Sequence, residues 1–151
     1  MAQEVFIGDV DGRAWRDGKD LYASETIGPG LLCIVTSGSS AALADANDNP
    51  DGVAYGARHQ EYRPTSKSFA ADEAMTLLKG DFVCWYSSDF FVGETVPSVG
   101  DSIYSAADGT MDTSGTYKVG KVTRALSRIE EVAGVGSSQS LVEILFEIGK
   151  P

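Results

Sequence analysis

The fold is decided by the last apolar stretch of the chain, residues 141–148, which read Leu-Val-Glu-Ile-Leu-Phe-Glu-Ile. Aliphatic and aromatic residues in a run of this length favour a strand near the centre of a sheet. Similar runs precede it at residues 31–36, 52–57, 82–86, 101–105 and 117–126. Turn residues separate the runs, and the 151 residues include 17 glycines. The sequence therefore predicts an all-β fold, a small barrel or sandwich of short antiparallel strands.

Two stretches repeat the same order of parts. Residues 28–59 and residues 98–126 each hold a glycine turn, a short strand, a small polar turn and a second strand with a glycine beside apolar residues. A glycine in that position is typical of a strand that bends at a barrel corner. Two copies are too few for a solenoid, so they predict two β units packed into one sandwich or closed barrel.

Two segments are harder to assign. Residues 69–79 fit a short helix, but Met75 to Tyr86 also fits a hairpin that turns at Lys79-Gly80-Asp81, and we favour the hairpin because its second arm is strongly β in composition. Residues 130–140 contain two glycines and a serine-rich stretch, which predicts a loop.

The N-terminal residues 1–26 are polar and bury little apolar surface by themselves. We therefore divide the chain into an N-terminal arm, residues 1–26, and a β-domain, residues 27–151. The arm either gains order by lying on another molecule or forms an edge hairpin of its own domain, and the sequence leaves both open.

Charge and composition exclude several classes of function. The chain has 12 basic and 22 acidic residues and a net charge of −10, which argues against binding nucleic acid or an anionic membrane surface. No apolar run reaches the length of a membrane span, and the first residues show no signal peptide. Cys33 and Cys84 lie in apolar runs and are expected to be buried thiols, although a bridge between them stays possible.

The sequence offers no catalytic, cofactor-binding or metal-binding residues, and we expect no enzyme activity and no cofactor. His59 is the single histidine, and the chain has no nucleophile elbow or phosphate loop. Asn47 to Gly52 matches part of a calcium loop but begins with Asn and has Arg58 at the twelfth position, while Asp9 to Gly12 places its glycine too early. A small trimeric enzyme of the dUTP pyrophosphatase type is the weakest alternative, because Thr113 rather than Arg precedes Ser114-Gly115.

At this point the order of motifs resembles a known family. The motifs are LLCIVTSG (31–38), PDGVAYGA (50–57), MTLLKGDFVCW (75–85), VGDSIYSAADGTMDTSG (99–115), YKVGKVTRAL (117–126) and SLVEILFEI (140–148). In this order they are similar to the capsid decoration, or cement, proteins of tailed double-stranded DNA bacteriophages. The resemblance covers residues 28–148. It implies a structural protein of the virion that binds the outer surface of the expanded head and clamps neighbouring major capsid proteins, often as a homotrimer.

The resemblance sets the remaining expectations. The partners would be the major capsid protein and other copies of the chain, and the protein would reside in the host cytoplasm during assembly and on the capsid afterwards. The expected capsid-contact residues belong to the arm and are Val5, Phe6, Ile7, Trp15 and Tyr22. Alternatives are another virion part, such as a tail or head-fibre base protein, and a carbohydrate-binding module with Trp15, Trp85 or Tyr86 exposed on one face.

Overall fold

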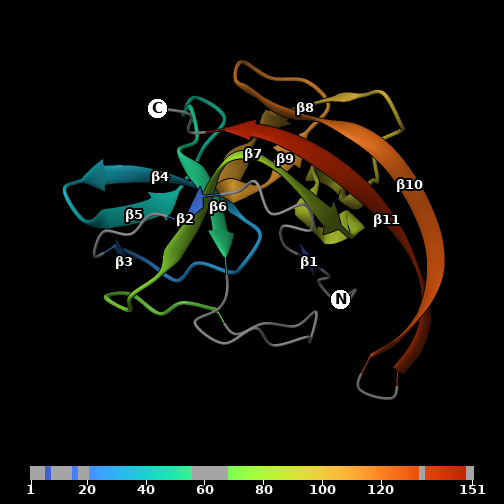
Figure 1. Ribbon diagram of the computed structural model, residues 1–151, viewed down its shortest axis with the longest axis horizontal. Coiled ribbons are helices and arrows are strands. Elements are labelled where there is room, and N and C mark those ends of the chain that lie inside the picture. The colour runs from blue at the N-terminus through green and yellow to red at the C-terminus, as the bar shows by residue number, and fades with distance from the viewer. Residues whose placement is uncertain (1–5, 8–14, 17–20, 56–67, 133–134, 149–151) are drawn as a thin grey trace.

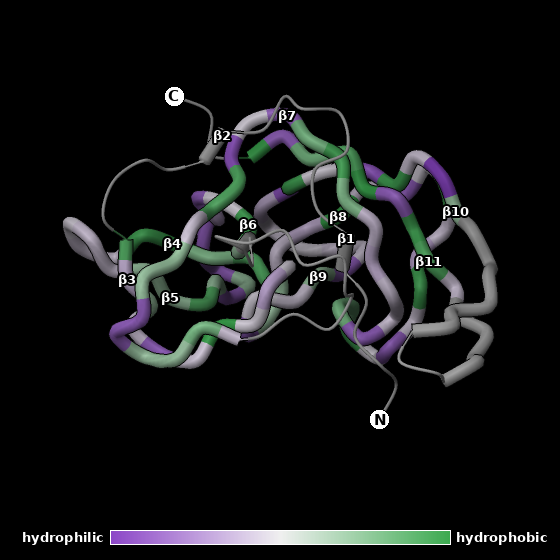
Figure 2. The backbone as a smooth tube through the Cα atoms, turned by 60° about the horizontal axis from the view of Figure 1, so that its bottom comes forward, coloured by the Kyte–Doolittle hydropathy of each residue, from purple (hydrophilic) through white to green (hydrophobic). Residues whose placement is uncertain are grey.

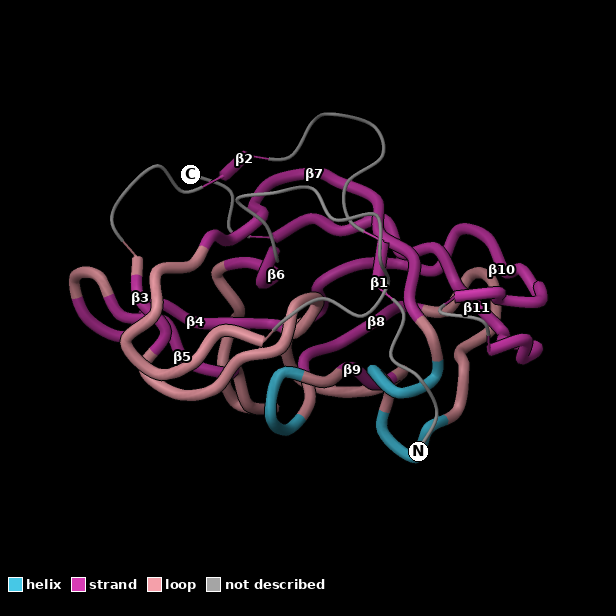
Figure 3. The backbone as a smooth tube through the Cα atoms, turned by 90° about the horizontal axis from the view of Figure 1, so that it is seen from below, coloured by secondary structure: helices cyan, strands magenta, loops and turns pink. Residues whose placement is uncertain are grey.

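Eleven strands form one mixed sheet in the computed structural model, which describes residues 6–7, 15–16, 21–55, 68–132 and 135–148 (Figure 1). The strands are β1 (Phe6–Ile7), β2 (Trp15–Arg16), β3 (Tyr22–Ala23), β4 (Leu32–Ser37), β5 (Ser40–Leu43), β6 (Gly52–Tyr55), β7 (Thr76–Tyr86), β8 (Ser102–Ser105), β9 (Met111–Asp112), β10 (Lys118–Val132) and β11 (Val135–Ile148). Three 3-10 helices, η1 (Ser88–Phe90), η2 (Val92–Glu94) and η3 (Ala107–Gly109), gather on one side of the strands (Figure 3). The described residues contain no α-helix, so the all-β prediction is confirmed.

The sheet is open rather than closed into a barrel. Its strand order is β3-β5-β4-β6-β7-β11-β10-β8-β9, with β1 and β2 added to β7. Among the described strands β3 pairs with β5 in parallel, and the other ladders are antiparallel. The expectation of short strands is wrong for β7, β10 and β11, which have 11, 15 and 14 residues. The fold is therefore held together by the long strands β7, β10 and β11 and not by closure of a barrel.

The internal repeat predicted from the sequence reappears in the strand order. The first unit is arranged β5-β4-β6-β7 and the second β9-β8-β10-β11, and the two units join where β7 pairs with β11. The turn before β4 and the turn before β8 are held in the same way. The amide of Gly30 donates to the carbonyl of Ala54 (2.7 Å), and the amide of Gly100 donates to the carbonyl of Val122 (2.9 Å). Both glycines have positive φ, 90° and 94°, a conformation that glycine adopts without steric cost.

Strand β7 connects the two units in one run. Its residues Thr76–Leu78 pair with β6, and Gly80–Tyr86 pair with β11. The hairpin expected at Lys79-Gly80-Asp81 is therefore wrong, although strand rather than helix is right for most of the segment. The buried positions alternate without a break from Leu78 through Gly80 to Tyr86, so reversing the chain there would lose this continuous buried face. Gly80 has a φ of 93° and sits where β7 changes partners.

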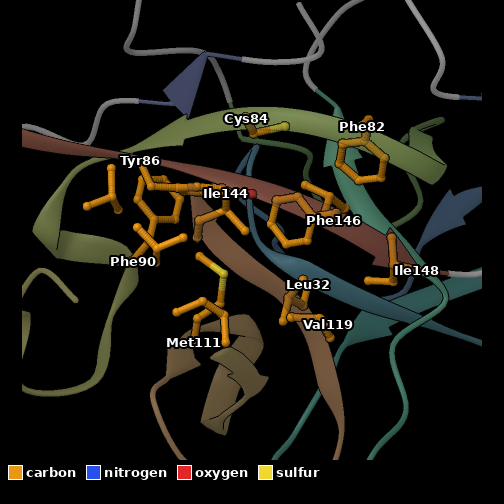
Figure 4. Close-up of a cluster of buried hydrophobic side chains, with 14 of the residues drawn as sticks. Leu32, Phe82, Cys84, Tyr86, Phe90, Met111, Val119, Ile144, Phe146 and Ile148 are labelled. Atoms are coloured by element: carbon orange, nitrogen blue, oxygen red, sulfur yellow. The ribbon is translucent and has the colours of Figure 1, made fainter. Parts of the chain in front are cut away.

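Two apolar clusters form the core. The larger one spans both units and is built around Phe82, Tyr86 and Phe146, whose rings lie 5.0 Å (Phe82–Phe146) and 5.8 Å (Tyr86–Phe146) apart between centroids (Figure 4). The hydroxyl of Tyr86 donates to the carbonyl of Gly30 (2.9 Å), which satisfies the buried polar atom. Apolar residues recur along β7 and β11, the strands that carry these rings (Figure 2).

The smaller cluster covers the opposite face of the first unit. Leu32 belongs to the larger cluster and its neighbour Cys33 to the smaller one, so β4 is buried on both faces. The smaller cluster contains Leu21, Ala23, Ile27, Cys33, Ala41, Ala54, Phe69, Met75 and Leu77. Cys33 and Cys84 lie in different clusters as buried free thiols, which confirms their expected state, and burial raises the pKa of Cys33 to about 12.

Candidate interaction surfaces

The predicted capsid-contact residues whose backbone is described belong to three strands, β1, β2 and β3. The backbone of β1, with Phe6 and Ile7, pairs with the last residues of β7, whereas Trp15 in β2 pairs with Lys79 near its middle. Tyr22, in β3, pairs with Ser40 on β5 and also bridges Ala74, two residues before β7 begins, and its side chain is 41% exposed. Val5 lies outside the described residues. Among the five, Tyr22 is thus the residue whose side chain is described and is available to a partner.

The residues around the end of the proposed arm belong to the core. Leu21 and Ala23 are 3% and 1% exposed and pack in the same apolar cluster as Ile27. The amide of Ala23 also donates to the carbonyl of Glu73 (2.9 Å). A truncation designed to test the arm should therefore end before Leu21, because deletion of residues 1–26 removes core side chains together with the arm.

A polar cluster that the sequence did not indicate ties three strands together. Arg124 on β10, Glu143 on β11 and Trp85 on β7 are register neighbours. The carboxylate of Glu143 is held by Arg124, whose Nε donates to Oε1 (3.0 Å) and whose Nη2 donates to Oε2, and the guanidinium lies 5.3 Å from the centroid of the Trp85 ring. Cation–π contact and a bidentate ion pair thus act together across the sheet.

A register shift in β10 completes this cluster. The shift falls between Val122 and Arg124, and the hydroxyl of Thr123 also donates to Oε1 of Glu143 (2.8 Å). A bulge of this kind lets two consecutive residues of one strand face a single residue of the next. The sequence gives one sign of this cluster, the acidic residue Glu143 inside the apolar run 141–148. The partners of Glu143 depend on the strand register, which the sequence did not reveal.

Hydrogen bonds from Arg124 hold the pKa of Glu143 below its usual value, although burial acts in the opposite direction. A carboxyl group whose pKa is lower in the folded state stabilises the fold above its unfolded pKa of about 4.3 and loses that contribution as the pH falls through the folded value. We expect Glu143→Gln to lower the melting temperature by roughly 2–4 °C at pH 7. The difference from the unsubstituted protein should shrink as the pH is lowered from 5 to about 2.5.

Thermal unfolding followed by circular dichroism across this pH range measures the effect. Glu147→Gln is the matched control, because Glu147 lies on the same strand with an exposed side chain. A constant difference between the Glu143→Gln protein and the unsubstituted protein at all pH values would contradict the role given to the carboxylate.

Three of the four clustered aromatic residues, Tyr86, Phe90 and Phe91, belong to the interior, and the fourth, Trp85, is half-buried. Tyr86, Phe90 and Phe91 are 0%, 2% and 4% exposed, and the ring of Trp85 faces the Arg124 guanidinium. Their rings pack edge to face, with centroids 4.9 Å apart for Tyr86–Phe90 and 6.3 Å for Tyr86–Phe91. Of the three aromatic residues on which the carbohydrate-binding alternative depended, Tyr86 is buried, Trp85 is half-buried against Arg124, and Trp15 is described only in its backbone.

Acidic side chains in the turns cap the backbone. The amide of Asp45 donates to Oδ2 of Asp48 (2.9 Å), the amide of Asp108 donates to Oδ1 of Asp45 (3.3 Å), and the amide of Val35 donates to Oδ2 of Asp51 (2.7 Å). The first contact lies within one turn, and the other two join residues that are far apart in the sequence. Within the described part of the chain, no three His, Cys, Asp or Glu residues gather as metal ligands. The Asp9 to Gly12 segment and His59 lie outside the described residues.

Comparison with known proteins gives no relative. No family model matches the chain, and no match is found among curated proteins. In the part of the chain that the structure describes, no helix has the length and apolarity needed to cross a membrane.

Proposed function

We propose that this chain is a capsid decoration protein that binds the outer surface of a tailed-phage head, as a homotrimer, and clamps neighbouring major capsid proteins. It works without catalysis or cofactor, and it resides on the virion after assembly in the host cytoplasm. The observation that carries the proposal is the strand order, because the motifs of the resemblance fall on successive strands of one sheet. Five of the six motifs fall on one strand each, namely β4, β6, β7, β10 and β11. The motif at residues 99–115 covers β8, η3 and β9.

The physics of a clamp fits such a chain. A protein that binds only the assembled shell stabilises it by mass action, and weak contacts repeated over a lattice add through multivalency. A net charge of −10 keeps the free protein soluble and favours docking on a basic patch of the shell. In the structure β7 is a single continuous strand, where the sequence had predicted a hairpin.

The test is to add the purified protein to undecorated, expanded phage heads and to measure bound copies per head and the temperature at which the heads release their DNA. We expect saturable binding and a higher release temperature. The absence of binding would contradict the proposal. Binding to isolated tails or fibre bases instead, seen by electron microscopy, would replace it with the alternative virion role.

Two variants locate the contact. A protein without residues 1–16 lacks β1 and β2 but retains Leu21, so we expect weaker binding to heads with an unchanged β-type circular dichroism spectrum. Tyr22→Ser tests the exposed aromatic side chain, and Val99→Ser, at a side chain that is 57% exposed in a loop, is its control. Full binding by both the truncated protein and the Tyr22→Ser protein would exclude the arm as the contact.

A further inference from the structure

The hairpin of β10 and β11 extends beyond the rest of the sheet. Its register runs without a shift from Leu126↔Leu141 to Val132↔Val135. In the described chain, β8 pairs with β10 only up to Lys121, and β7 pairs with β11 only from Val142 onward. Seven residue pairs, roughly 24 Å at about 3.4 Å each, therefore form a two-stranded ribbon, which curves away from the sheet in Figure 1.

A ribbon of two strands is only marginally stable in water, and among the described strands none pairs with either outer edge of the ribbon. The other ends of the sheet are protected differently. They are β3 and β9, which have two residues each, and each also bridges a further residue, Tyr22 to Ala74 and Met111 to Phe91. Short edge strands are a common protection against pairing with another chain. The ribbon lacks this protection, so its edges stand out as the place where a further strand can be added.

The two edges of the ribbon differ in charge. The β10 edge carries Arg124, Arg128, Glu130 and Glu131, and charged residues on an edge strand discourage pairing. The β11 edge, from residue 135 to residue 142, carries no charged residue, and its middle reads Gly-Ser-Ser-Gln-Ser. The β11 edge is therefore the open one.

We propose that two copies of this chain pair through the free edge of β11, antiparallel about a two-fold axis near Ser138. This register places Gly136 opposite Ser140 of the second copy, so small uncharged residues face one another along the contact. The result is a four-stranded sheet in the order β10-β11-β11-β10, with the charged β10 edges on the outside.

The uncharged edge suits a second copy as the occupant, because two β11 edges meet without like charges opposite one another. Two chains of net charge −10 repel one another over most of their surfaces, but the β11 edge is uncharged. Antiparallel pairing places the two bodies at opposite ends of the ribbons. They are then on the order of 20 Å apart, which exceeds the screening length of about 8 Å at physiological salt. The contact is isologous and closes on itself, so it does not lead to a filament.

This contact goes beyond the proposed function and does not depend on a phage head. A two-fold contact is also distinct from the three-fold contacts of the proposed homotrimer. Its test is therefore carried out on the purified full chain, and its failure would leave shell binding unaffected.

The test is disulfide cross-linking through a single introduced cysteine. Ser138→Cys should link two chains under mild oxidation and give a species of twice 16.0 kDa on a non-reducing denaturing gel. Cys33 and Cys84 do not compete, because both are fully buried. The controls are Ser114→Cys in an exposed turn and Ser127→Cys on the β10 edge. Cysteines at residues 137, 139 and 140 locate the axis if it lies beside Ser138.

A second variant measures the same contact without cross-linking. Ser138→Lys/Ser140→Lys adds two charges to the open edge, and Ser98→Lys/Ser114→Lys adds the same two charges to exposed turns. By analytical ultracentrifugation we expect the edge variant to raise the dissociation constant of the pair at least tenfold and the control to leave it within about twofold.

Three results would overturn the proposal. The first is that no β11 cysteine links more efficiently than Ser114→Cys. The second is preferential linking through Ser127→Cys. The third is an edge variant that associates as strongly as its control. Protection of the β11 amides from hydrogen exchange by added capsid protein alone would instead assign the edge to a strand of that protein.

Discussion

Truncation of Phe146 to alanine is expected to destabilise the fold by about 3–5 kcal/mol, the largest effect of any single substitution considered for this chain. Phe146 is fully buried in the larger core cluster, where its ring stacks on Phe82 at 5.0 Å and meets Tyr86 at 5.8 Å. Its backbone pairs with Phe82 on β7 and with Gly120 on β10. The substitution leaves a cavity between the two units, which a sheet paired on both sides fills only in part.

The measurement is urea unfolding followed by tryptophan fluorescence and circular dichroism. Leu145→Ala is the matched control on the same strand, because Leu145 points to the opposite face and is 37% exposed. We expect the control to cost about 1 kcal/mol or less. A loss for Phe146→Ala no larger than that of the control would mean that the larger cluster is not the core of the fold.

Much of the fold follows from local composition. The strand runs at residues 31–36, 82–86 and 141–148 correspond to β4, the second half of β7 and β11, because buried strands are rich in aliphatic and aromatic residues. The internal repeat was also visible, since its glycine turns recur at the same places in both units. Both turns need a residue with positive φ, and Gly30 and Gly100 supply it. Because glycine is the residue that adopts this conformation without steric cost, the turns can be recognised in the sequence.

The errors concern interactions between distant residues. Residues 130–140 were expected to form a loop because serine and glycine have low strand propensity. They form the ribbon instead, since β10 and β11 supply one another with backbone hydrogen bonds from Leu126 to Val132. The turn expected at Lys79-Gly80-Asp81 failed for the same reason, because β7 has partners on both units that a local pattern does not contain.

The candidate surfaces were the least predictable part. The cluster of Arg124, Glu143 and Trp85 joins three strands, and one bulged register decides which side chains meet. The open edge of β11 likewise depends on strand lengths. It exists only where β10 and β11 extend beyond their neighbours β8 and β7. Apolar periodicity indicates which face of a strand is buried, but it does not indicate which strands lie beside it.

Substitution of either repeat glycine by alanine, Gly52→Ala or Gly120→Ala, is expected to destabilise the fold by about 1–3 kcal/mol. A Cβ atom at Gly120 would lie 2.6 Å from the carbonyl oxygen of Leu145, and a Cβ atom at Gly52 would lie 2.8 Å from the carbonyl oxygen of Leu78. Both contacts are with the backbone of the adjacent strand, which cannot move aside as a flexible side chain can. Neither cost depends on a positive φ, so the strain arises from the close approach of the strands.

The control is Gly28→Ala, in the turn before β4. A Cβ atom there would make an ordinary contact of 3.5 Å with the side chain of Leu31. We expect this substitution to change the free energy of unfolding by no more than about 0.5 kcal/mol, with a possible gain from the smaller entropy of the unfolded chain. Urea unfolding of the three proteins makes the comparison. Because Gly52 and Gly120 occupy equivalent strands of the two units, comparable losses at both would support their equivalence, whereas a loss at only one would show that the units pack differently there.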